Sequence, residues 1–348
     1  MKILIAGGTG LIGSRLINSL RLQSHNVIIL SRNPSKHKKK FDSQVSFVDW
    51  QSTDIELLKD VDAVIKLSGE SVAQLWTKNA KKKILDSRIN LSKKLSKFLI
   101  KNEINSQVLI NASAIGFYSK KTMLYDGEVN ENSNSGDSFL SKVCRLNEES
   151  CEIFSNQGMR VVHIRIGMVL TKKFSLLIGL TSLFSLPIPG SKNHYFPWVH
   201  IDDVVGFINH ALKNNIQGPF NLISPKASTH QEFYHTIRKH FFRSLGLTFI
   251  LFGLTIESYV LYLEYILLDS FQQNIILIIF GAIFIILGLQ YRGIIPWILF
   301  IPTFIIKMAG DISEIVLYGP KTNPLRTLDS RYKFKFPDLE EALHNIDK

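Results

Sequence analysis

The sequence predicts an α/β fold with a doubly wound parallel sheet, a small C-terminal domain and an inserted α-helical hairpin. Short runs rich in Ile, Val and Leu alternate with helical patterns over residues 1–170, as in sheets whose parallel strands are joined by helices. A glycine-rich turn follows the first run, and a long apolar stretch interrupts the second half of the chain.

The first predicted element is a buried strand over Lys2–Ala6 that enters a glycine-rich turn. Gly7 permits a tight turn, Gly10 leaves room for a pyrophosphate at the backbone, and Gly13 lets the next helix pack closely on the strand. The helix N-terminus adds unpaired N–H groups and a partial positive charge. The turn therefore predicts a Rossmann-like dinucleotide site. Its predicted contact residues are Gly7, Thr9, Gly10, Leu11, Ile12 and Gly13.

The second predicted strand, Asn26–Leu30, is followed by Ser31 and Arg32. A site that prefers NAD(H) usually carries an acidic residue here to hold the ribose 2′-hydroxyl. The Arg32 guanidinium can instead bind a 2′-phosphate through charge-assisted hydrogen bonds, whereas a carboxylate would repel it. Ser31 and Arg32 therefore predict NADP(H) rather than NAD(H) as the cofactor.

Four further strands are predicted, at Val45–Val48, Val61–Leu67, Gln107–Ala112 and Arg160–Ile166. Helical patterns occupy Ala73–Ile100 and Ser138–Gln157. Ligands of such sheets bind beyond the carboxyl ends of the strands. Further cofactor contacts are predicted at Leu67, Ser68, Gly69 and Glu70. We expect one crevice to be lined by Gly10, Arg32, Gly69 and Ser113.

Beyond Gly167 the alternation of strands and helices is less regular. The segments 187–190 (PIPG) and 197–203 (PWVHIDD) indicate loops and a strand around a substrate cleft. Asp202 or Asp203 is expected to cap the helix that follows. His200 and the two aspartates could be metal ligands, but no other His or Cys lies at ligand spacing near them, so no metal site is predicted.

Charge and cysteine content exclude several classes of protein. The 348 residues carry a formal net charge of +12, from 41 basic minus 29 acidic residues. Such a surface suits anionic lipid or nucleic acid, but no nucleic-acid motif accompanies it, so lipid ranks first and no nucleic-acid partner is predicted. Two cysteines exclude a disulfide scaffold. Met1-Lys2 leads directly into the first strand, which predicts no signal peptide.

Seven stretches together resemble one protein family. They are GGTGLIG at 7–13, LSGES at 67–71, SRI at 87–89 after Trp76, ASAIGFY at 112–118, RIGMVL at 165–170, WVHIDD at 198–203 and FPDLEEAL at 336–343. The combination resembles the atypical, extended short-chain dehydrogenases called epimerase family proteins, the bacterial relatives of the vertebrate family 39U member. The resemblance covers about 1–240 and 294–346.

This resemblance implies a domain organisation. An NADP(H)-binding Rossmann domain would occupy 1–170, a substrate region would be formed by 171–243 and 294–348, and 244–293 would be an insertion. Arg165, which opens one of the matching stretches, joins the predicted cofactor-binding residues. The family does not imply a known substrate.

The catalytic pair of the extended short-chain dehydrogenases is missing. They use a Tyr-x-x-x-Lys helix beside a Ser or Thr, and the Lys lowers the pKa of the tyrosine so that it can exchange a proton as hydride moves. The resemblance places those two positions at Leu140 and Cys144, which cannot serve. We predict that Ser113 orients a substrate oxygen and that Tyr118 donates a proton; the alternative for Tyr118 is a packing role.

The stretch 244–293 has no counterpart in that family. Leu245–Leu268 is apolar apart from Glu257 and Glu264, residues 269–274 (DSFQQN) form a polar turn, and Ile275–Leu289 is uninterrupted apolar sequence. This pattern predicts a transmembrane hairpin. The positive residues Arg238, Lys239, Arg243 and Arg292 place its ends on the cytoplasmic side. A hydrophobic dimer interface, or a hairpin that lies on a membrane surface through 245–291, is the alternative.

Two functions remain open from the sequence. One is an NADP(H)-dependent oxidoreductase or epimerase that acts on an unknown small or nucleotide-linked substrate at the cytoplasmic face of a membrane, the inner membrane in a bacterium. The other is a non-catalytic, nucleotide-binding regulatory protein, for example one related to cell division. The missing Tyr and Lys favour the second, and Ser113 with the cleft motifs favours the first. A soluble cytoplasmic location is the alternative to membrane attachment, and a homodimer stays open.

Overall fold

The computed structural model describes the chain except residues 39–40, 42–44, 53, 73, 120–126, 173–193, 268–270, 292–318 and 348. The chain divides into two compact units. The first comprises Met1–Leu170, His194–Ala227 and Ala309–Pro337, and the second comprises Thr171–Asn193, Ser228–Met308 and Asp338–Lys348. The predicted loop at 187–190, the positive flank at Arg292 and residues 294–318 of the predicted segment 294–348 lie outside the described residues.

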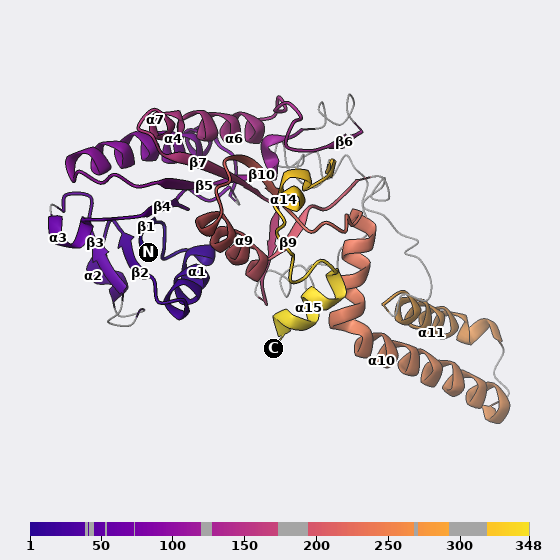
Figure 1. Ribbon diagram of the computed structural model, residues 1–348. Helices are drawn as coiled ribbons and strands as arrows, with labels where there is room; N and C mark the ends of the chain where they lie inside the picture. Colours follow the sequence, from indigo (N-terminus) through magenta and orange to yellow (C-terminus); the bar gives the residue numbers. More distant parts are fainter. Residues whose placement is uncertain are drawn as a thin grey trace. The chain divides into compact units, whose positions relative to one another are not determined.

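The first unit is built on a parallel sheet, which has seven strands in the described part of the chain (Figure 1). In spatial order they are β10 (Gly218–Leu222), β7 (Arg160–Ile166), β5 (Val108–Ala114), β4 (Ala63–Lys66), β1 (Lys2–Ala6), β2 (Asn26–Leu30) and β3 (Val45–Val48). The order reverses direction between β4 and β1, and doubly wound sheets bind their ligands at the carboxyl ends of the strands around such a point. The predicted α/β class is confirmed.

Helices cover both faces of this sheet (Figure 1). On one face α1 (Leu11–Leu22) and α9 (Ile201–Lys213) bury apolar side chains in a core shared with β1, β5 and β7. On the other face α4 (Lys78–Lys101) and α7 (Glu152–Ser155) contribute to a second core, and α6 (Phe139–Glu149) lies beside α4. Because both faces are covered, the strands are apolar almost throughout, as parallel strands usually are.

Short elements complete the first unit. They are α2 (Pro34–Lys38), α3 (Ile55–Leu58), the 3₁₀ turn η1 (Ile115–Phe117), β6 (Glu128–Val129), β8 (Met168–Leu170), β9 (Trp198–His200), β11 (Lys321–Thr322) and α14 (Leu325–Asp329). β8 pairs with β9, and β6 pairs with β11. The second pair joins the segment after residue 318 to the sheet-bearing unit.

Several predicted elements have different bounds in the structure. The strand predicted over Val61–Leu67 is shorter, and the strand β10 was not predicted. The helix predicted over Ser138–Gln157 is two helices, α6 and α7, with a break at Ser150 and Cys151. The helix predicted from Ala73 begins at Lys78, because the side chain of Thr77 accepts a hydrogen bond from the Ala80 N–H and caps it.

The predicted cap of α9 was wrong. The N-cap is His200, whose Nδ1 accepts a hydrogen bond from the backbone N–H of Asp202 at 3.1 Å. Asp203 instead accepts backbone N–H groups from Lys335 at 2.6 Å and Phe336 at 3.0 Å. The carboxylate of Asp203 thus fastens the segment at 335–336 to α9 and is not available as a cap.

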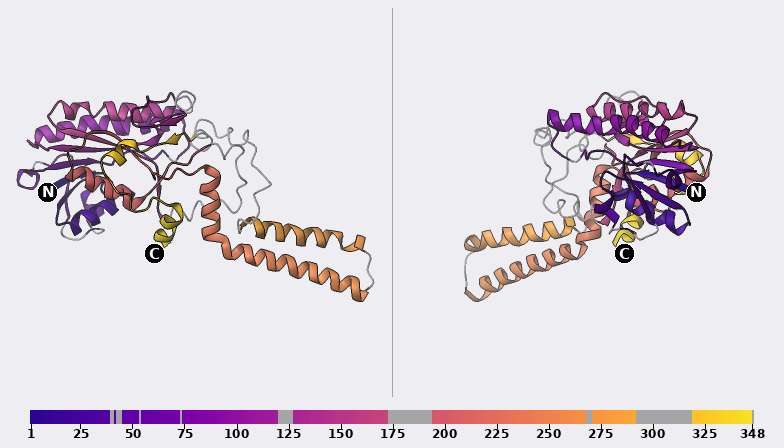
Figure 2. Two further views of the ribbon diagram at one scale, coloured as in Figure 1. Left: turned by 45° about the vertical axis from the view of Figure 1, so that its right-hand side comes forward. Right: turned by 90° about the vertical axis from the view of Figure 1, so that its left-hand side faces the viewer.

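The second unit contains three described helices, α10 (His230–Leu267), α11 (Phe271–Tyr291) and α15 (Leu339–Asp347). α10 and α11 run side by side as a helical hairpin (Figures 1 and 2). Gly253 makes a close approach possible, because a Cβ added there would lie 2.7 Å from the carbonyl oxygen of Gly281. Glu257 in turn packs against Gly281.

The transmembrane prediction for this hairpin is not supported. In the part of the chain that the structure describes, no helix combines the length and the apolar character needed to cross a membrane. The apolar side chains of the two helices pack partly on each other, as Phe252 and Phe284 do with ring centroids 5.0 Å apart. Glu257, the acidic residue in this apolar stretch, lies against Gly281 in the contact between the two helices.

Candidate functional site

Two cavities adjoin at the carboxyl ends of the strands in the first unit. The Arg32 cavity, of about 330 Å³, is lined by the ends of β1, β2 and β4 and by α4. The Ser113 cavity, of about 430 Å³, is lined by the ends of β4, β5 and β7 and by α4 and α6. Ser68 and Gly69 line both cavities, so the two meet at the end of β4.

The structure distributes the predicted cofactor residues over these two cavities. Lining the Arg32 cavity are Gly7, Thr9, Ser31, Arg32, Ser68, Gly69 and Glu70. Lining the Ser113 cavity are Ile12, Leu67, Ser68 and Gly69, with Ser113 and Tyr118. Outside the lining of both are Gly10, Leu11, Gly13 and Arg165. The single crevice predicted from the strand ends is therefore a pair of connected cavities.

The glycine turn has the geometry that its spacing predicts. Gly7 has a φ of +96°, and a Cβ added there would lie 2.6 Å from the backbone nitrogen of Ser68. A Cβ on Gly13 would lie 2.6 Å from the carbonyl oxygen of Gly7. Gly10, the N-cap of α1, has no atom closer than 3.5 Å to an added Cβ. Gly7 and Gly13 therefore serve the fold, and Gly10 leaves open space before the helix N-terminus.

Arg32 is exposed at the mouth of its cavity, next to Ser31 at the end of β2. Lys94 of α4 also lines this cavity, and its ammonium lies 4.5 Å from the centroid of the Trp50 ring. Glu70 and Asp86 supply two carboxylates to the same wall. The lining of the Arg32 cavity thus combines cationic groups, which can hold a phosphate, with an aromatic ring.

Ser113 lines the second cavity and is held by a buried network. Its hydroxyl donates a hydrogen bond of 2.7 Å to the carboxylate of Glu148 on α6. Arg165 stands opposite Ser113 in the pairing of β5 with β7 and reaches the same carboxylate, with Nε at 3.0 Å and an NH2 nitrogen at 2.9 Å. The carboxylate is therefore held by three hydrogen bonds and an ion pair whose two side chains are almost completely buried.

Tyr118 lines the Ser113 cavity with its ring, but its hydroxyl is engaged elsewhere. The hydroxyl accepts a hydrogen bond from Arg165 at 2.8 Å and has two acceptors, the carbonyl of Asn130 at 2.7 Å and the Asn221 side chain at 3.0 Å. Burial raises the pKa of Tyr118, although Arg165 acts in the opposite direction. The Tyr118 hydroxyl is thus engaged by three protein groups, and its role as a proton donor stays a prediction beside the alternative of a packing role.

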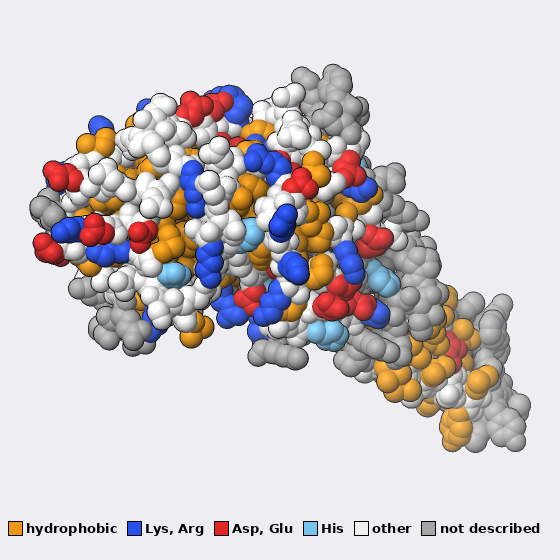
Figure 3. Space-filling model, in the orientation of Figure 1, with side chains coloured by type: hydrophobic (Ala, Val, Ile, Leu, Met, Phe, Trp, Pro, Cys, Tyr) orange, Lys and Arg blue, Asp and Glu red, His pale blue; other side chains and the backbone are white. Residues whose placement is uncertain are grey.

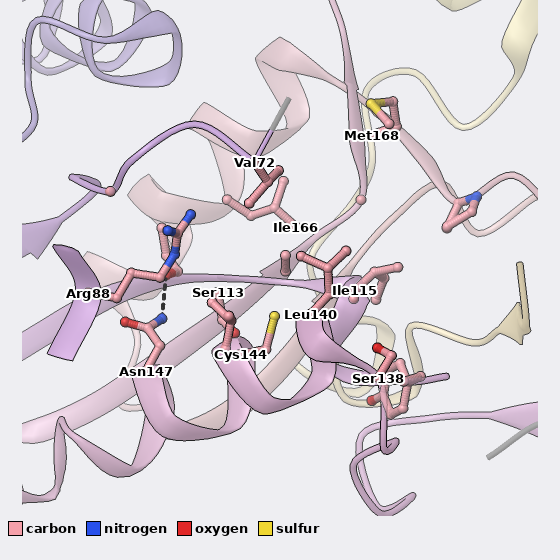
Figure 4. Close-up of a pocket in the computed structure, with 18 of the residues that line it drawn as sticks. Val72, Arg88, Ser113, Ile115, Ser138, Leu140, Cys144, Asn147, Ile166 and Met168 are labelled. Atoms are coloured by element: carbon pink, nitrogen blue, oxygen red, sulfur yellow. Dashed lines mark hydrogen bonds between the residues drawn. The ribbon is translucent and has the colours of Figure 1, made fainter. Parts of the chain in front are cut away.

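Leu140 and Cys144 of α6 line the Ser113 cavity beside Ser113 (Figure 4). The family resemblance places the missing tyrosine and lysine at these two positions. Burial raises the pKa of the Cys144 thiol to about 12, so the thiol stays protonated and is not a nucleophile. The α6 wall of the cavity offers an aliphatic group and an inert thiol.

Four residues of this region were not predicted as functional. Glu148 was missed because a glutamate in a helical pattern usually faces solvent. Arg88 lies within the SRI stretch of the family resemblance, which was the one signal that pointed to it. Lys66 is buried at the end of β4, where its ammonium donates to Ser92 at 2.7 Å and to Asn147 at 2.8 Å. Burial lowers the pKa of Lys66, and Asn147 lines the Ser113 cavity.

Comparison with known proteins places this arrangement in a family. Residues 3–222, which carry the sheet and both cavity floors, match the model of the NAD dependent epimerase/dehydratase family. The chain belongs to that family. Residues 301–346 match a domain of unknown function, DUF1731. The stretch 244–293 lies between these two matches.

Two relatives match this chain over nearly its whole length. An epimerase family protein SDR39U1 homolog, chloroplastic, from Arabidopsis thaliana is 34% identical over 99% of this chain and 86% of its own. Epimerase family protein YfhF of Bacillus subtilis is 26% identical over 99% of this chain and 98% of its own. The resemblance found in the sequence is confirmed.

Solved structures of the family have the same fold. The crystal structure of human epimerase family protein SDR39U1 with NADPH matches with a TM-score of 0.68 and 25% identity over 99% of both chains. A nucleoside-diphosphate sugar epimerase from Corynebacterium glutamicum matches with a TM-score of 0.63 and 23% identity over 99% of this chain and 58% of its own.

Proposed function

We propose that the chain is an NADP(H)-dependent oxidoreductase or epimerase that acts on a small substrate in the Ser113 cavity. The observation that carries this proposal is the meeting of the two cavities at Ser68 and Gly69. One extended ligand can run from Arg32, past the glycine turn, to Ser113. An NAD(P) molecule has that extended form, and doubly wound sheets bind it at this point of the fold.

The preference for NADP(H) is supported by the end of β2. Ser31 and Arg32 line the cavity where an NAD(H)-specific site usually has a carboxylate. The human relative was crystallised with NADPH. Arg32 would hold the 2′-phosphate, and Trp50 with Lys94 would face the adenine.

Ser113 and Glu148 offer a route for the proton that the missing tyrosine would have carried. The bound cofactor would supply or accept the hydride. Because the Ser113 hydroxyl donates to Glu148, its oxygen can accept the O–H of a substrate alcohol. As the alcohol loses hydride, its proton would pass to Ser113 while the serine proton passes to Glu148. Reduction of a carbonyl would run through the same groups in reverse.

Titration calorimetry with NADPH and NADH tests the cofactor assignment. The native chain is expected to bind NADPH at least tenfold more tightly than NADH. Arg32→Glu should reverse that preference, because a carboxylate repels the 2′-phosphate and can hold a free 2′-hydroxyl. Equal binding of the two nucleotides, unchanged in Arg32→Glu, would refute the NADP(H) preference.

A regulatory, non-catalytic nucleotide-binding protein is the second candidate. Leu140 and Cys144, in the wall where the family resemblance expects the tyrosine and lysine, favour it. A panel of alcohols and carbonyl compounds, followed by the absorbance of reduced nicotinamide, separates the two candidates. Turnover that is lost in Ser113→Ala supports the enzyme; tight NADPH binding with no turnover over the whole panel supports the regulator.

For the helical hairpin we propose peripheral attachment to a membrane surface. Exposed apolar side chains occur on both helices (Figure 3). They are Leu247, Leu251, Phe252, Leu254, Leu261, Leu277, Ile279, Phe280, Ile283 and Ile286. Co-flotation with anionic liposomes, lost on Leu251→Ser with Phe280→Ser, is the expected result. A hairpin that forms a stable dimer and does not float would instead assign these residues to a protein interface.

A further inference from the structure

We propose that the substrate at Ser113 is an uncharged ketone or secondary alcohol whose carbon chains carry few other polar groups. The inference rests on the proposed function, because it takes the nicotinamide and the reacting carbon to meet in the Ser113 cavity. It deepens that function by naming the chemical class of the substrate, and it sets this class apart from nucleotide-linked sugars.

Apolar side chains form most of the described lining of the Ser113 cavity. They come from separate elements and include Val72, Trp76, Ile115, Leu140, Ile166 and Met168. Figure 4 shows Ile115 and Leu140 beside Ser113, with Val72 and Ile166 above them in the view. Apolar walls are usual for small-molecule sites, and the few polar groups among them decide which ligand fits. The polar side chains of this cavity are therefore the informative ones.

Two of these polar side chains bond to the protein itself. The Nε1 of Trp76 donates to the carbonyl oxygen of Val72 at 2.9 Å. An indole has no second donor and no acceptor, so its remaining surface is apolar. Asn147 is engaged at both ends, because its Oδ1 accepts from Lys66 at 2.8 Å and its Nδ2 donates to the carbonyl oxygen of Ala112 at 3.0 Å.

Two serines of the lining serve local structure in the same way. The Ser138 hydroxyl accepts the backbone N–H of Ser141 at 3.1 Å and caps α6. The Ser119 hydroxyl donates to the carboxylate of Asp137 at 3.0 Å. The protonated thiol of Cys144 is only a weak hydrogen-bonding group. None of these groups is arranged to receive the hydroxyls of a sugar.

The charged end of the cavity lies at its junction with the Arg32 cavity. Gly69 lines both cavities, and a Cβ added to it would lie 3.0 Å from the guanidinium carbon of Arg88. Arg88 is the one charged side chain among the described lining residues. Its NH1 nitrogen donates to the carbonyl oxygens of Glu70 at 3.1 Å and Ile84 at 2.9 Å, and the Glu70 carboxylate attracts its charge. Because the proposed cofactor passes this junction, the substrate is left with the uncharged part.

In that part, Ser113 is the polar side chain that can meet the reacting group. Its hydroxyl donates to Glu148 at 2.7 Å, so its oxygen can accept the O–H of one alcohol. The Tyr118 hydroxyl already has three protein partners. Each further hydroxyl of a substrate would be buried without a partner, which costs about tenfold in affinity. One oxygen on an apolar body satisfies this cavity.

A panel of ketones that share carbon skeletons tests the proposal. The alkan-2-ones from butanone to octan-2-one differ only in apolar length. Erythrulose adds three hydroxyls to the skeleton of butanone, and 5-oxohexanoate adds a carboxylate to that of hexan-2-one. UDP-glucose represents the nucleotide-linked sugars. Saturation-transfer NMR on the chain saturated with NADP⁺ measures binding, and the absorbance of NADPH measures turnover of the ketones.

The value of kcat/KM should rise about fourfold with each methylene from butanone to octan-2-one, because each one buries further apolar surface. Erythrulose should fall about 100-fold below butanone, since its added hydroxyls find no partners. The carboxylate of 5-oxohexanoate should cost about as much relative to hexan-2-one, because it would be buried without a cation. UDP-glucose should show no saturation transfer to its sugar protons.

Three variants make the result specific to the apolar wall. Leu140→Ser should lower kcat/KM for octan-2-one about tenfold, since it removes apolar contact area, and should change the value for erythrulose little. Leu140→Met keeps an apolar side chain of similar volume and should keep the preference for long alkanones. Ile153→Ser, at an exposed position of α7, should change neither value. A Kd for NADPH within about twofold of the native value shows that each variant is folded.

The outcomes separate this inference from the proposed function. A native chain that binds no NADPH overturns both. Binding of alkanones beside the nucleotide, with no turnover of any probe, overturns the proposed reaction and supports the apolar ligand class. A chain that binds NADPH and prefers erythrulose, 5-oxohexanoate or UDP-glucose, or binds no alkanone at all, overturns the inference alone. An alkanone preference that is unchanged in Leu140→Ser does so too, because the wall would then not select the substrate.

Discussion

Ser113, which lines a cavity, and Glu148 lie 35 positions apart in the chain and form a hydrogen bond of 2.7 Å. The strand β5 brings the serine there, and the helix α6 brings the glutamate. Arg165 from the neighbouring strand holds the other side of the carboxylate. Serine, carboxylate and guanidinium thus form a continuous chain from the cavity surface into the core.

Ser113→Ala and Tyr118→Phe form a matched pair, since each removes one hydroxyl from this region. Ser113→Ala should lower turnover by about 10²-fold or more, the usual scale for loss of a proton-transfer group, with the Kd of NADPH within twofold. Tyr118→Phe should keep turnover but lower the free energy of unfolding by about 1–3 kcal/mol, because Arg165 and Asn221 lose a buried partner. Steady-state kinetics with urea unfolding checks both. The reverse pattern, activity lost only in Tyr118→Phe, would restore the tyrosine as the proton donor.

Glu148→Gln should destabilise the chain by about 3–5 kcal/mol, because it leaves the Arg165 charge buried without its anion. The control is Glu149→Gln, next along α6, whose ion pair with Arg145 is exposed on both sides. That change should stay within about 1 kcal/mol. Urea unfolding of the two variants measures the difference, and equal stabilities would show that the Arg165 charge is compensated by other groups.

Two glycines of the glycine turn should respond differently to substitution by alanine, one mainly in stability and the other mainly in NADPH binding. Gly13→Ala forces a Cβ against the carbonyl oxygens of Gly7 and Gly8 and should cost about 1–3 kcal/mol or more of unfolding free energy. Gly10→Ala has space in the nucleotide-free chain and should cost about 1 kcal/mol or less. Gly10→Ala should nevertheless weaken NADPH at least tenfold, since its methyl group would stand where the diphosphate approaches. Thermal unfolding and calorimetry on both variants check this; normal NADPH binding by Gly10→Ala would move the diphosphate away from the turn.

His200 should make stability depend on pH. It is 2% exposed, its Nε2 has no hydrogen-bond partner among the described residues, and burial lowers its pKa to about 4. Below about pH 6.5 the unfolded chain protonates this histidine and the folded chain does not, so stability falls as pH drops towards 4. His200→Asn keeps a capping side chain for α9 but does not titrate. Between about pH 7 and 5 the native chain should lose about 2 kcal/mol more than this variant; parallel losses in urea titrations would contradict the assignment.

Much of the sheet could be predicted because buried parallel strands are apolar runs with clear ends. β1, β2, β3 and β7 have the predicted bounds. β10 (GPFNL) could not be found this way, because it opens with Gly and Pro and is an edge strand with only two large apolar residues. The break between α6 and α7 also leaves no signal in the periodicity, since the residues on both sides continue to face the core.

The candidate site was predicted in the residues at its strand ends and not in the charged residues that its helices contribute. Gly7, Arg32, Gly69 and Ser113 follow strands, so the rule for parallel sheets located them. Glu148 and Arg88 lie inside helices, where a charged residue looks like solvent-facing surface. Only the pairing of β5 with β7 and the approach of α6 show that Glu148 faces inward. Hydropathy likewise located the helical hairpin, but the prediction that it crosses a membrane is not supported by the described residues.

Leu140 and Cys144 stand one helical turn apart on the wall that α6 gives to the Ser113 cavity. A tyrosine and a lysine at these two positions would enter the same space, while the glycine turn, the strand ends and the Arg32 cavity stayed as they are. The two substitutions would therefore change the chemistry of one cavity and leave the lining of the other untouched, because Leu140 and Cys144 line the Ser113 cavity and not the Arg32 cavity.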